Sequence, residues 1–306
     1  MFLKSLICLF PWLILATTET SIAKAGCQDT CGNISIPNPF GVGEPHCYQQ
    51  SGLQLVCNES FNPPKLLYGN IPLVSISLLN GTMTVGLGVS YYCYDRAGEL
   101  SDWQTWTFTL NENYYFSDTR NKFTAIGCDT NAVMSDSFVE IFKSGCMSVC
   151  ANERSVVEGS CSGIGCCQTA IPKGLKTLNV SLSSFYNHKH SWDFNPCSYA
   201  FFADSEQFNF SLPNLLNFTG MEPKIDNYIS FPAVFDWVIG LETCEEAKRN
   251  WTSYACGDNT DCANYANGPG YRCQCNQGYE GNPYLIDGCQ GNKYFASSFI
   301  GIMSPA

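Results

Sequence analysis

Apolar and polar residues alternate with a period of two along much of the chain, which predicts β-strands rather than helices. Residues 74–78 alternate apolar side chains with serines, and the alternation resumes over residues 83–89 after Asn80-Gly81. An Asn-Gly pair between two alternating runs is typical of a hairpin turn. Further alternating runs cover residues 105–110, 178–182 and 208–212. The pattern therefore predicts a mostly β protein.

Cysteines and turn residues divide these runs into modules. We expect one small disulfide-clamped β domain at residues 26–100 and a second at 101–232. A cysteine-rich module at 240–289 and a short non-membrane tail at 290–306 would follow. The segments PNPF and SFPAVF are expected outside the strand ladders, because proline has no amide hydrogen to donate.

The first 25 residues have the pattern of a secretory signal peptide. A single lysine precedes an apolar run from Leu6 to Ala16, and small residues end at Ala25. We expect cleavage after Ala25 and secretion to the extracellular space. No later apolar run reaches the ~18 residues that a membrane span needs, so no span is expected in this chain.

The chain contains 19 cysteines, and loss of Cys8 with the leader leaves an even number. An oxidising compartment favours complete disulfide pairing over a zinc thiolate site. Cys166 and Cys167 are expected to bond to different partners, because a ring closed between adjacent residues is strained. The connectivity of the twelve cysteines before residue 244 stays open.

Seven Asn-x-Ser/Thr sequons predict a glycoprotein with glycans on surface turns. They start at Asn33, Asn58, Asn80, Asn179, Asn209, Asn217 and Asn250.

The net charge of −11 argues against nucleic acid as a partner.

The sequence does not predict an enzyme. It lacks the nucleophile elbow, the HExxH zinc motif, the P-loop and the kinase motifs, and its three histidines are His46, His188 and His190. His188, His190 and Asp193 have a metal-like spacing, but a polar loop is the favoured interpretation. No metal site, catalytic residue or cofactor is therefore expected.

Aromatic residues crowd the span 91–116, and strand alternation requires some of them to face outward. Exposed rings stack on the C–H faces of sugars, while a core role explains the same residues equally well. Our candidates for sugar contact are Tyr91, Tyr92, Tyr94 and Trp103. Cations are few before residue 100, chiefly Lys65 and Arg96, and a second group comprises Lys173, Lys176, His188, Lys189 and His190.

The six cysteines from Cys244 to Cys289 resemble an epidermal-growth-factor-like (EGF-like) module, with one residue between the fourth and fifth and Gly278-Tyr279 following. This resemblance implies the pairs Cys244–Cys262, Cys256–Cys273 and Cys275–Cys289. Calcium-binding members carry acidic residues before the first cysteine, whereas this chain has Gly-Leu-Glu-Thr there, so a calcium site is not expected. Thr243 and Glu246 form a capping-box pattern that predicts a short helix.

The run CGNISIPNPFG at residues 31–41, followed by Cys47 and Cys57, resembles the galacturonan-binding domain of plant wall-associated receptor kinases, with Asn38 in place of the usual tyrosine. GCDTNA at 127–132, GSCSGIGCCQTAIPKGL at 159–175 and FNPCSYAFF at 194–202 are similar to the middle region of the same ectodomains. The family's membrane span and kinase are not expected in this chain, so kinase activity does not carry over.

The resemblance implies a secreted or wall-facing protein of the apoplast that binds pectic polysaccharide, with Lys65 and Arg96 as candidate uronate contacts. Calcium would enter only as a bridge between uronates and Asp or Glu. The alternative function is a protein-binding or decoy receptor ectodomain, whose EGF-like module docks a peptide or co-receptor.

Overall fold

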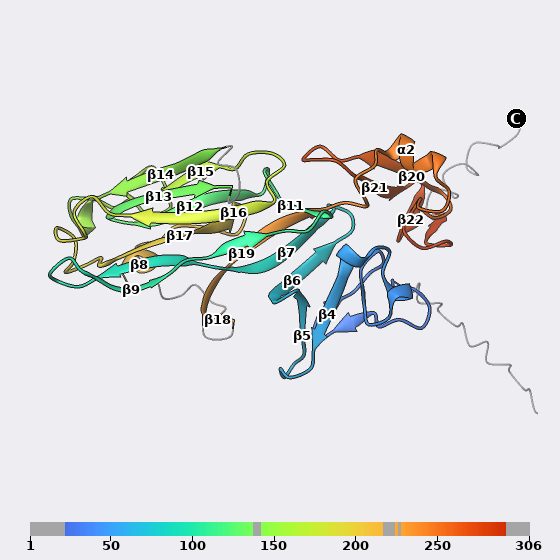
Figure 1. The fold of residues 1–306 in the computed structure, drawn as a ribbon, viewed down its shortest axis with the longest axis horizontal. Helices are drawn as coiled ribbons and strands as arrows, with labels where there is room; N and C mark the ends of the chain where they lie inside the picture. The colour runs from blue at the N-terminus through green and yellow to red at the C-terminus, as the bar shows by residue number, and fades with distance from the viewer. Residues whose placement is uncertain (1–21, 137–141, 217–223, 226–227, 292–306) are drawn as a thin grey trace, which may run out of the picture.

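The computed structural model describes residues 22–136, 142–216, 224–225 and 228–291. Residues 1–21 of the expected leader, the Asn217 sequon and nearly all of the tail lie outside these described residues. The molecule is elongated (Figure 1), with stacked β-sheets at one end and the first strands and the C-terminal module at the other. The described residues contain no helix that is long and apolar enough to cross a membrane.

The largest sheet joins strands from distant parts of the chain in the order β11-β19-β7-β6-β5-β4-β3, with β18 pairing β19. Its strands are β3 (Gly41–Val42), β4 (Gln54–Asn58), β5 (Lys65–Tyr68), β6 (Ile71–Ser77), β7 (Thr82–Gly88), β11 (Tyr114–Phe116), β18 (Lys224–Ile225) and β19 (Tyr228–Trp237). The predicted hairpin is confirmed, since β6 and β7 pair antiparallel across the Asn80-Gly81 turn. Gly81 has φ 63° there, a conformation that favours glycine.

Two further sheets stack face to face on the left of Figure 1. One has the order β15 (Gly165–Ala170), β12 (Asn121–Gly127), β17 (Cys197–Asp204), β8 (Ser90–Tyr94) and β9 (Leu100–Gln104). The other has the order β10 (Thr107–Thr109), β16 (Thr177–Ser183), β13 (Asp129–Ser135) and β14 (Lys143–Val149). Aromatic rings such as Phe116, Phe123 and Phe202 are buried in the main core. The mostly β prediction is thus confirmed.

The boundary expected near residue 100 does not separate two sheets. Leu100 opens β9, which forms a hairpin with β8. In addition, β7 pairs with β19 and β8 with β17, so the expected first domain is built into the second. The alternating pattern reveals which residues form strands but does not encode the distant strands with which they pair.

Two local predictions were wrong. SFPAVF lies inside β19, where Pro232 is opposite Gly86. On its other side, β19 pairs with β11 only at Phe235–Trp237, so β11 does not reach Pro232. Proline is tolerated at such an unpaired strand edge because no hydrogen bond from its nitrogen is needed. The run 208–212 is not a strand; it leads into α1 (Leu212–Leu216), and Phe210 is buried in a second core beside Phe201.

All 18 cysteines from Cys27 onward are paired. Cys166 and Cys167 have different partners, as predicted, namely Cys161 and Cys146. The other pairs before residue 244 are Cys27–Cys47, Cys31–Cys57, Cys93–Cys197 and Cys128–Cys150. The first four cysteines therefore clamp the short strands β1 (Thr30–Cys31) and β2 (Ile34–Ser35) to β4 and its preceding loop.

The C-terminal module, residues 244–291, contains α2 (Cys244–Arg249), β20 (Thr260–Asn264), β21 (Tyr271–Cys275), β22 (Tyr279–Gly281) and β23 (Cys289–Gly291). Its disulfides are Cys244–Cys262, Cys256–Cys273 and Cys275–Cys289, the same pairs that the resemblance implies. The capping box of Thr243 and Glu246 starts α2. Ile239 and Tyr271 exchange backbone hydrogen bonds of 2.9 and 3.2 Å, so the module continues directly from the large sheet.

Candidate functional site

The six predicted contact residues do not form one site. Five belong to a single hairpin: Tyr91, Tyr92 and Tyr94 lie in β8, Arg96 in the turn, and Trp103 in β9. Lys65 lies in β5, in a different sheet and away from this hairpin (Figure 1). The structure therefore separates the two predicted cations.

The aromatic residues of the hairpin face in two directions. The Tyr92 and Trp103 rings form a cross-strand pair with centroids 6.3 Å apart, and the Trp103 side chain is 57% exposed. Tyr91 points the other way, toward Tyr199, and its hydroxyl donates to Asp102 at 3.2 Å. By contrast, Tyr114, Tyr115 and Phe116 are buried. Exposure thus excludes these three rings from the surface and leaves Trp103 as the most exposed of the predicted aromatic residues.

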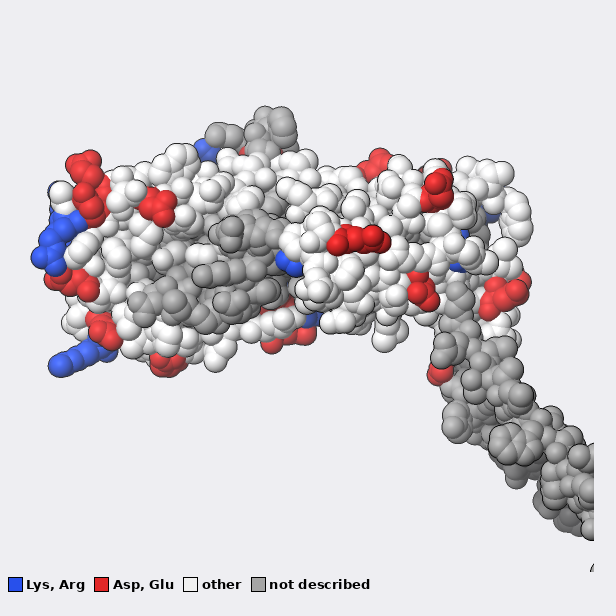
Figure 2. Space-filling model, turned by 90° about the horizontal axis from the view of Figure 1, so that it is seen from below, with Lys and Arg blue, Asp and Glu red and all other residues white. Residues whose placement is uncertain are grey.

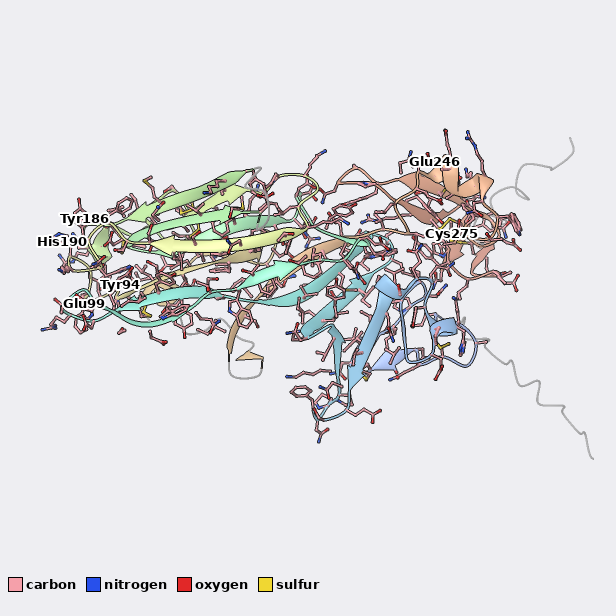
Figure 3. All side chains as sticks on the ribbon, viewed as in Figure 1. Tyr94, Glu99, Tyr186, His190, Glu246 and Cys275 are labelled. Carbon is pink, nitrogen blue, oxygen red and sulfur yellow. A yellow bond between two sulfur atoms is a disulfide. The ribbon has the colours of Figure 1, made fainter. Side chains whose placement is uncertain are left out.

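A loop from the middle of the chain completes the end of the hairpin. We call the combined surface, residues 94–99 and 184–195, the tip; its labelled residues lie together at the left of Figure 3. The Trp192 indole donates to the Tyr94 carbonyl at 2.8 Å, and the Tyr94 ring stacks on His188 with centroids 5.2 Å apart. The Cys93–Cys197 disulfide connects the strands behind the tip.

Asp129, the first residue of β13, binds the loop segment 184–188 of the tip. Its carboxylate accepts hydrogen bonds from the Ser184 hydroxyl and from the amides of Phe185, Tyr186 and His188, each amide at 2.9 Å. Burial opposes ionisation, but these four hydrogen bonds outweigh it and lower the pKa of Asp129. The loop can therefore adopt positive φ at Asn187 and His188, which is costly for residues other than glycine.

His188 is a structural residue in this geometry. Its Nδ1 lies 2.8 Å from the Asn195 carbonyl and therefore donates to it, which leaves Nε2 to accept from the Ser198 hydroxyl at 2.8 Å. Burial lowers its pKa, so the ring is neutral. The His190 ring instead packs edge-on against Tyr186 at the surface, 5.0 Å between centroids. The two imidazoles therefore do not converge on a common ligand.

The tip exposes charges of both signs beside its rings. The Arg96 guanidinium lies 4.6 Å from the centroid of the Trp192 ring and pairs with Asp193 at 2.8 Å, with both side chains largely exposed. Lys189 packs across the hairpin turn, since a Cβ added to Gly98 would lie 2.4 Å from Lys189 Cε. Figure 2 shows blue and red side chains gathered at this end, next to a body with few charges.

Lys65 has a different setting. Its ammonium lies over the Phe61 ring, 4.0 Å from the centroid, and it is paired across the strands with Asn58, a sequon asparagine. The six described sequon asparagines are all exposed or half-exposed. A glycan on Asn58 would therefore stand next to Lys65.

Sequence reasoning grouped Lys189 and His190 with other cations of the middle region and did not include them among the contact residues. Trp192 and Asp193 were likewise not predicted as neighbours of Arg96. The mixture of basic and aromatic residues in FYNHKHSWDF was the available signal. Only the pairing of β8 with β17 brings that segment to the hairpin.

Comparison with known proteins identifies relatives that align with most of the chain. Residues 27–86 match the family described as wall-associated receptor kinase galacturonan-binding. Wall-associated receptor kinase 2 of Arabidopsis thaliana is 39% identical over 266 residues, covering 86% of this chain and 34% of the relative. The chain is a homologue of the wall-associated receptor kinases.

Wall-associated receptor kinase 5 of Arabidopsis thaliana is 35% identical over 93% of this chain, and wall-associated receptor kinase 1 is 34% identical over 90%. The chain spans about one third of the length of these relatives, 37% and 36% respectively. No solved structure matches the chain. The galacturonan-binding segment comprises β1 to most of β7 and ends shortly before the hairpin that leads to the tip.

Proposed function

We propose that this chain is a secreted, cell-wall protein that binds pectic polysaccharide of the galacturonan type and is not an enzyme. The observation that carries the proposal is the match of residues 27–86 to the galacturonan-binding family. The kinase activity named in its relatives belongs to longer proteins, of which this chain covers 34% in the case of wall-associated receptor kinase 2.

The tip is the contact surface that we assign to the polysaccharide. An exposed ion pair contributes only about 0–1 kcal/mol, so a uronate carboxylate can replace Asp193 at the Arg96 guanidinium at little cost. Arginine binds carboxylates through two parallel hydrogen bonds. Lys189 offers a second cation, and the exposed Tyr186 ring offers a face for sugar C–H groups. The exposed Trp103 ring offers another such face on β9, outside the tip.

Calcium would act at this surface only as a bridge. Asp193 and Glu99 are exposed carboxylates at the tip, and calcium prefers oxygen ligands of this kind. A calcium ion shared between these groups and a uronate would offset the acidic net charge of the protein. Binding should then strengthen when calcium is added.

Retention on immobilised polygalacturonate, measured with and without calcium, tests this function. The native protein should be retained and a reduced, unfolded sample should not; equal retention would refute the proposal. Arg96→Ala and Lys189→Ala should each weaken binding about tenfold, the value of one charge-assisted contact. Arg249→Ala, on exposed α2, is the matched control, and Lys65→Ala tests the other predicted cation.

A second candidate is a protein-binding or decoy ectodomain. Two large apolar side chains of the C-terminal module are exposed, Trp251 by 87% and Ile286 by 75%. Such residues suit a peptide or co-receptor contact. Partners that co-purify from wall extract after pectinase digestion, and are lost with Trp251→Ala, would favour this function over polysaccharide binding.

A further inference from the structure

A polar pocket of about 360 Å³ lies where the β6–β7 turn meets the C-terminal module. Three segments line it: the turn with Asn80 and Thr82, the segment 117–120 before β12, and the β20–β21 loop with Tyr265 and Ala266. Its volume is at the lower end of the range for small-molecule pockets, about 300–1,000 Å³. The space suits a ligand of one or two sugar residues.

The two arginines that line this pocket are committed to partners within the protein. Arg272 donates to the carbonyls of Trp237 and Gly81, both at 2.6 Å, and to that of Asn80 at 3.3 Å. Arg120 pairs with Asp204 at 2.8 Å and Glu206 at 2.9 Å. The remaining charged lining is Lys173 against Asp118 and Asp236. This balance does not favour a uronate.

The uncharged lining suits a neutral sugar. It includes Asn80, Thr82, Thr119 and Tyr265, of which the two threonines carry hydroxyl groups, whereas Ser117 is fully buried. Hydroxyls both donate and accept hydrogen bonds, as sugar hydroxyls and acetamido groups require. The occupant that fits this lining is therefore an uncharged carbohydrate.

Asn80 itself stands at the pocket, and its side chain is exposed. It is the acceptor of the Asn-Gly-Thr sequon, so the first sugar of a glycan on Asn80 would begin at the pocket mouth. The turn is fixed there, because Arg272 donates hydrogen bonds to the carbonyls of both Asn80 and Gly81. A Cβ at Gly81 would lie 2.2 Å from the Arg272 guanidinium, so the contact is close.

We propose that Asn80 carries an N-linked glycan whose first N-acetylglucosamine residues occupy this pocket and join the β6–β7 hairpin to the C-terminal module. The glycan contacts residues 117–119 on one side and the β20–β21 loop on the other. It thereby closes the pocket to free polysaccharide. This inference does not depend on what the tip binds.

The first test uses the wild-type glycoprotein secreted from plant cells. Mass spectrometry of the peptide containing Asn80 should show an N-glycan. During digestion of the folded protein with peptide N-glycosidase, the Asn80 glycan should be released more slowly than the glycan on exposed Asn33. After reduction and unfolding of the protein, the two glycans should be released at the same rate. An unmodified Asn80, or equal release rates in the folded protein, would overturn the proposal.

The second test measures hydrogen exchange with matched variants. Asn80→Gln and Thr82→Val both remove the sequon, whereas Thr82→Ser keeps it. Residues 117–120 and 264–268 should exchange about threefold faster in the first two variants and remain unchanged in Thr82→Ser. No difference between the variants would contradict the glycan contact. Protection of these residues by added oligogalacturonate in the wild-type protein would also contradict it, because free polysaccharide would then be the occupant.

Discussion

The carboxylate of Asp129 accepts a hydrogen bond from the backbone amide of His188 at 2.9 Å, across 59 residues of sequence. The same carboxylate binds the amides of Phe185 and Tyr186. One buried anion in β13 therefore determines the course of the loop that places Trp192 against Arg96 and Lys189 against Gly98. The polysaccharide surface that we propose depends on this internal contact.

Asp129→Ala should loosen the tip without unfolding the sheets. Loss of the acceptor leaves the amides of Phe185 and Tyr186 without this partner, and the His188 amide keeps only a 3.2 Å bond to the Ser184 hydroxyl. Each unsatisfied buried group costs about 1–3 kcal/mol. Hydrogen exchange of residues 184–190 should accelerate, and affinity for polygalacturonate should fall together with it. Asp118→Ala, a half-buried aspartate outside the tip, is the control. Unchanged exchange in Asp129→Ala would show that the loop is held by other contacts.

Acid should loosen the same loop in two stages. Burial lowers the pKa of His188 in the folded protein, so its stabilising effect is complete above about 6.5, the pKa of a free histidine, and declines as pH falls below that. The hydrogen bonds to Asp129 lower its pKa as well, so its contribution is lost only below about 3.9. The protection of residues 184–190, measured relative to the intrinsic exchange rate at each pH, should decrease between pH 7 and 5, and His188→Gln should remove that first stage. If protection falls equally steeply with pH in His188→Gln, the first stage belongs to another titrating group.

The sequence predicted the strands better than their partners. The β6–β7 hairpin was predictable because Asn80-Gly81 is a local signal, and the capping box of α2 is equally local. The pairing of β7 with β19 and of β8 with β17 was not, because alternation is the same whichever strand lies alongside. Arg96 was found from its charge, but Trp192 and Asp193 became its neighbours only through that long-range pairing.

Arg272→Met should detach the β6–β7 turn from the C-terminal module. Burial lowers the pKa of this guanidinium, and three backbone carbonyls replace its hydration. Methionine keeps part of the packing but removes the arginine donor from all three carbonyls, although that of Gly81 keeps another bond, from the Trp237 amide at 3.2 Å. The expected cost is about 1.5–3 kcal/mol. Thermal unfolding should occur at lower temperature, and residues 78–82 should exchange faster. Arg249→Met, on the exposed face of α2, should change neither measurement.

Gly98→Ala should weaken polysaccharide binding by moving Lys189. Gly98 has φ 84°, so alanine costs about 1–2 kcal/mol there, and its Cβ would displace the Lys189 side chain from 2.4 Å away. Gly43→Ala is a close control, because Gly43 has the same φ and no atom within 4 Å of the added Cβ. Both variants should lose similar stability, and only Gly98→Ala should lose affinity for polygalacturonate. Equal affinities would remove Lys189 from the proposed surface.

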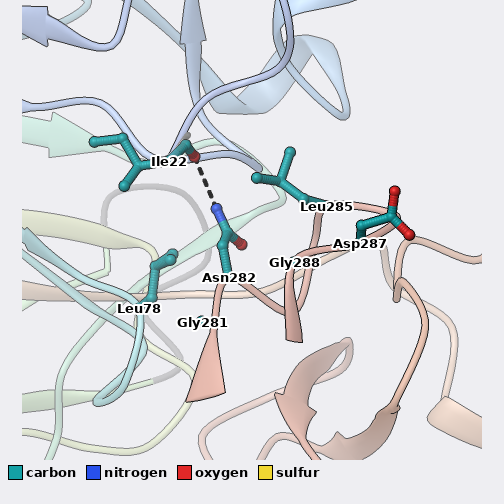
Figure 4. Close-up of a pocket in the computed structure, with 7 residues that line it drawn as sticks. All are labelled: Ile22, Leu78, Gly281, Asn282, Leu285, Asp287 and Gly288. Atoms are coloured by element: carbon teal, nitrogen blue, oxygen red, sulfur yellow. Dashed lines mark hydrogen bonds between the residues drawn. The ribbon is translucent and has the colours of Figure 1, made fainter. Parts of the chain in front are cut away.

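The contacts of the residues just before Cys27 constrain where the expected leader would be cut. The Ile22 carbonyl accepts from the Asn38 amide and from the Asn282 side chain, both at 2.8 Å, and Ala23 is buried. Figure 4 shows the second of these bonds beside a pocket of about 360 Å³ between Leu78 and Leu285. Cleavage after Ala25, which the small residues suggest, would remove these contacts and leave the buried Asn38 amide without its acceptor.

We therefore propose that signal peptidase cuts at or before the Ser21–Ile22 bond. The N-terminal peptide of the secreted protein, identified by mass spectrometry, should begin no later than Ile22. A protein that begins at Gly26 would contradict this. As a further check, a form engineered to begin at Gly26 should unfold at lower temperature than one that begins at Ser21, because loss of an acceptor for a buried amide costs about 1–3 kcal/mol. Asn282→Ala should lower the unfolding temperature of the longer form more than that of the shorter, since only the longer form makes the bond from Asn282 to Ile22.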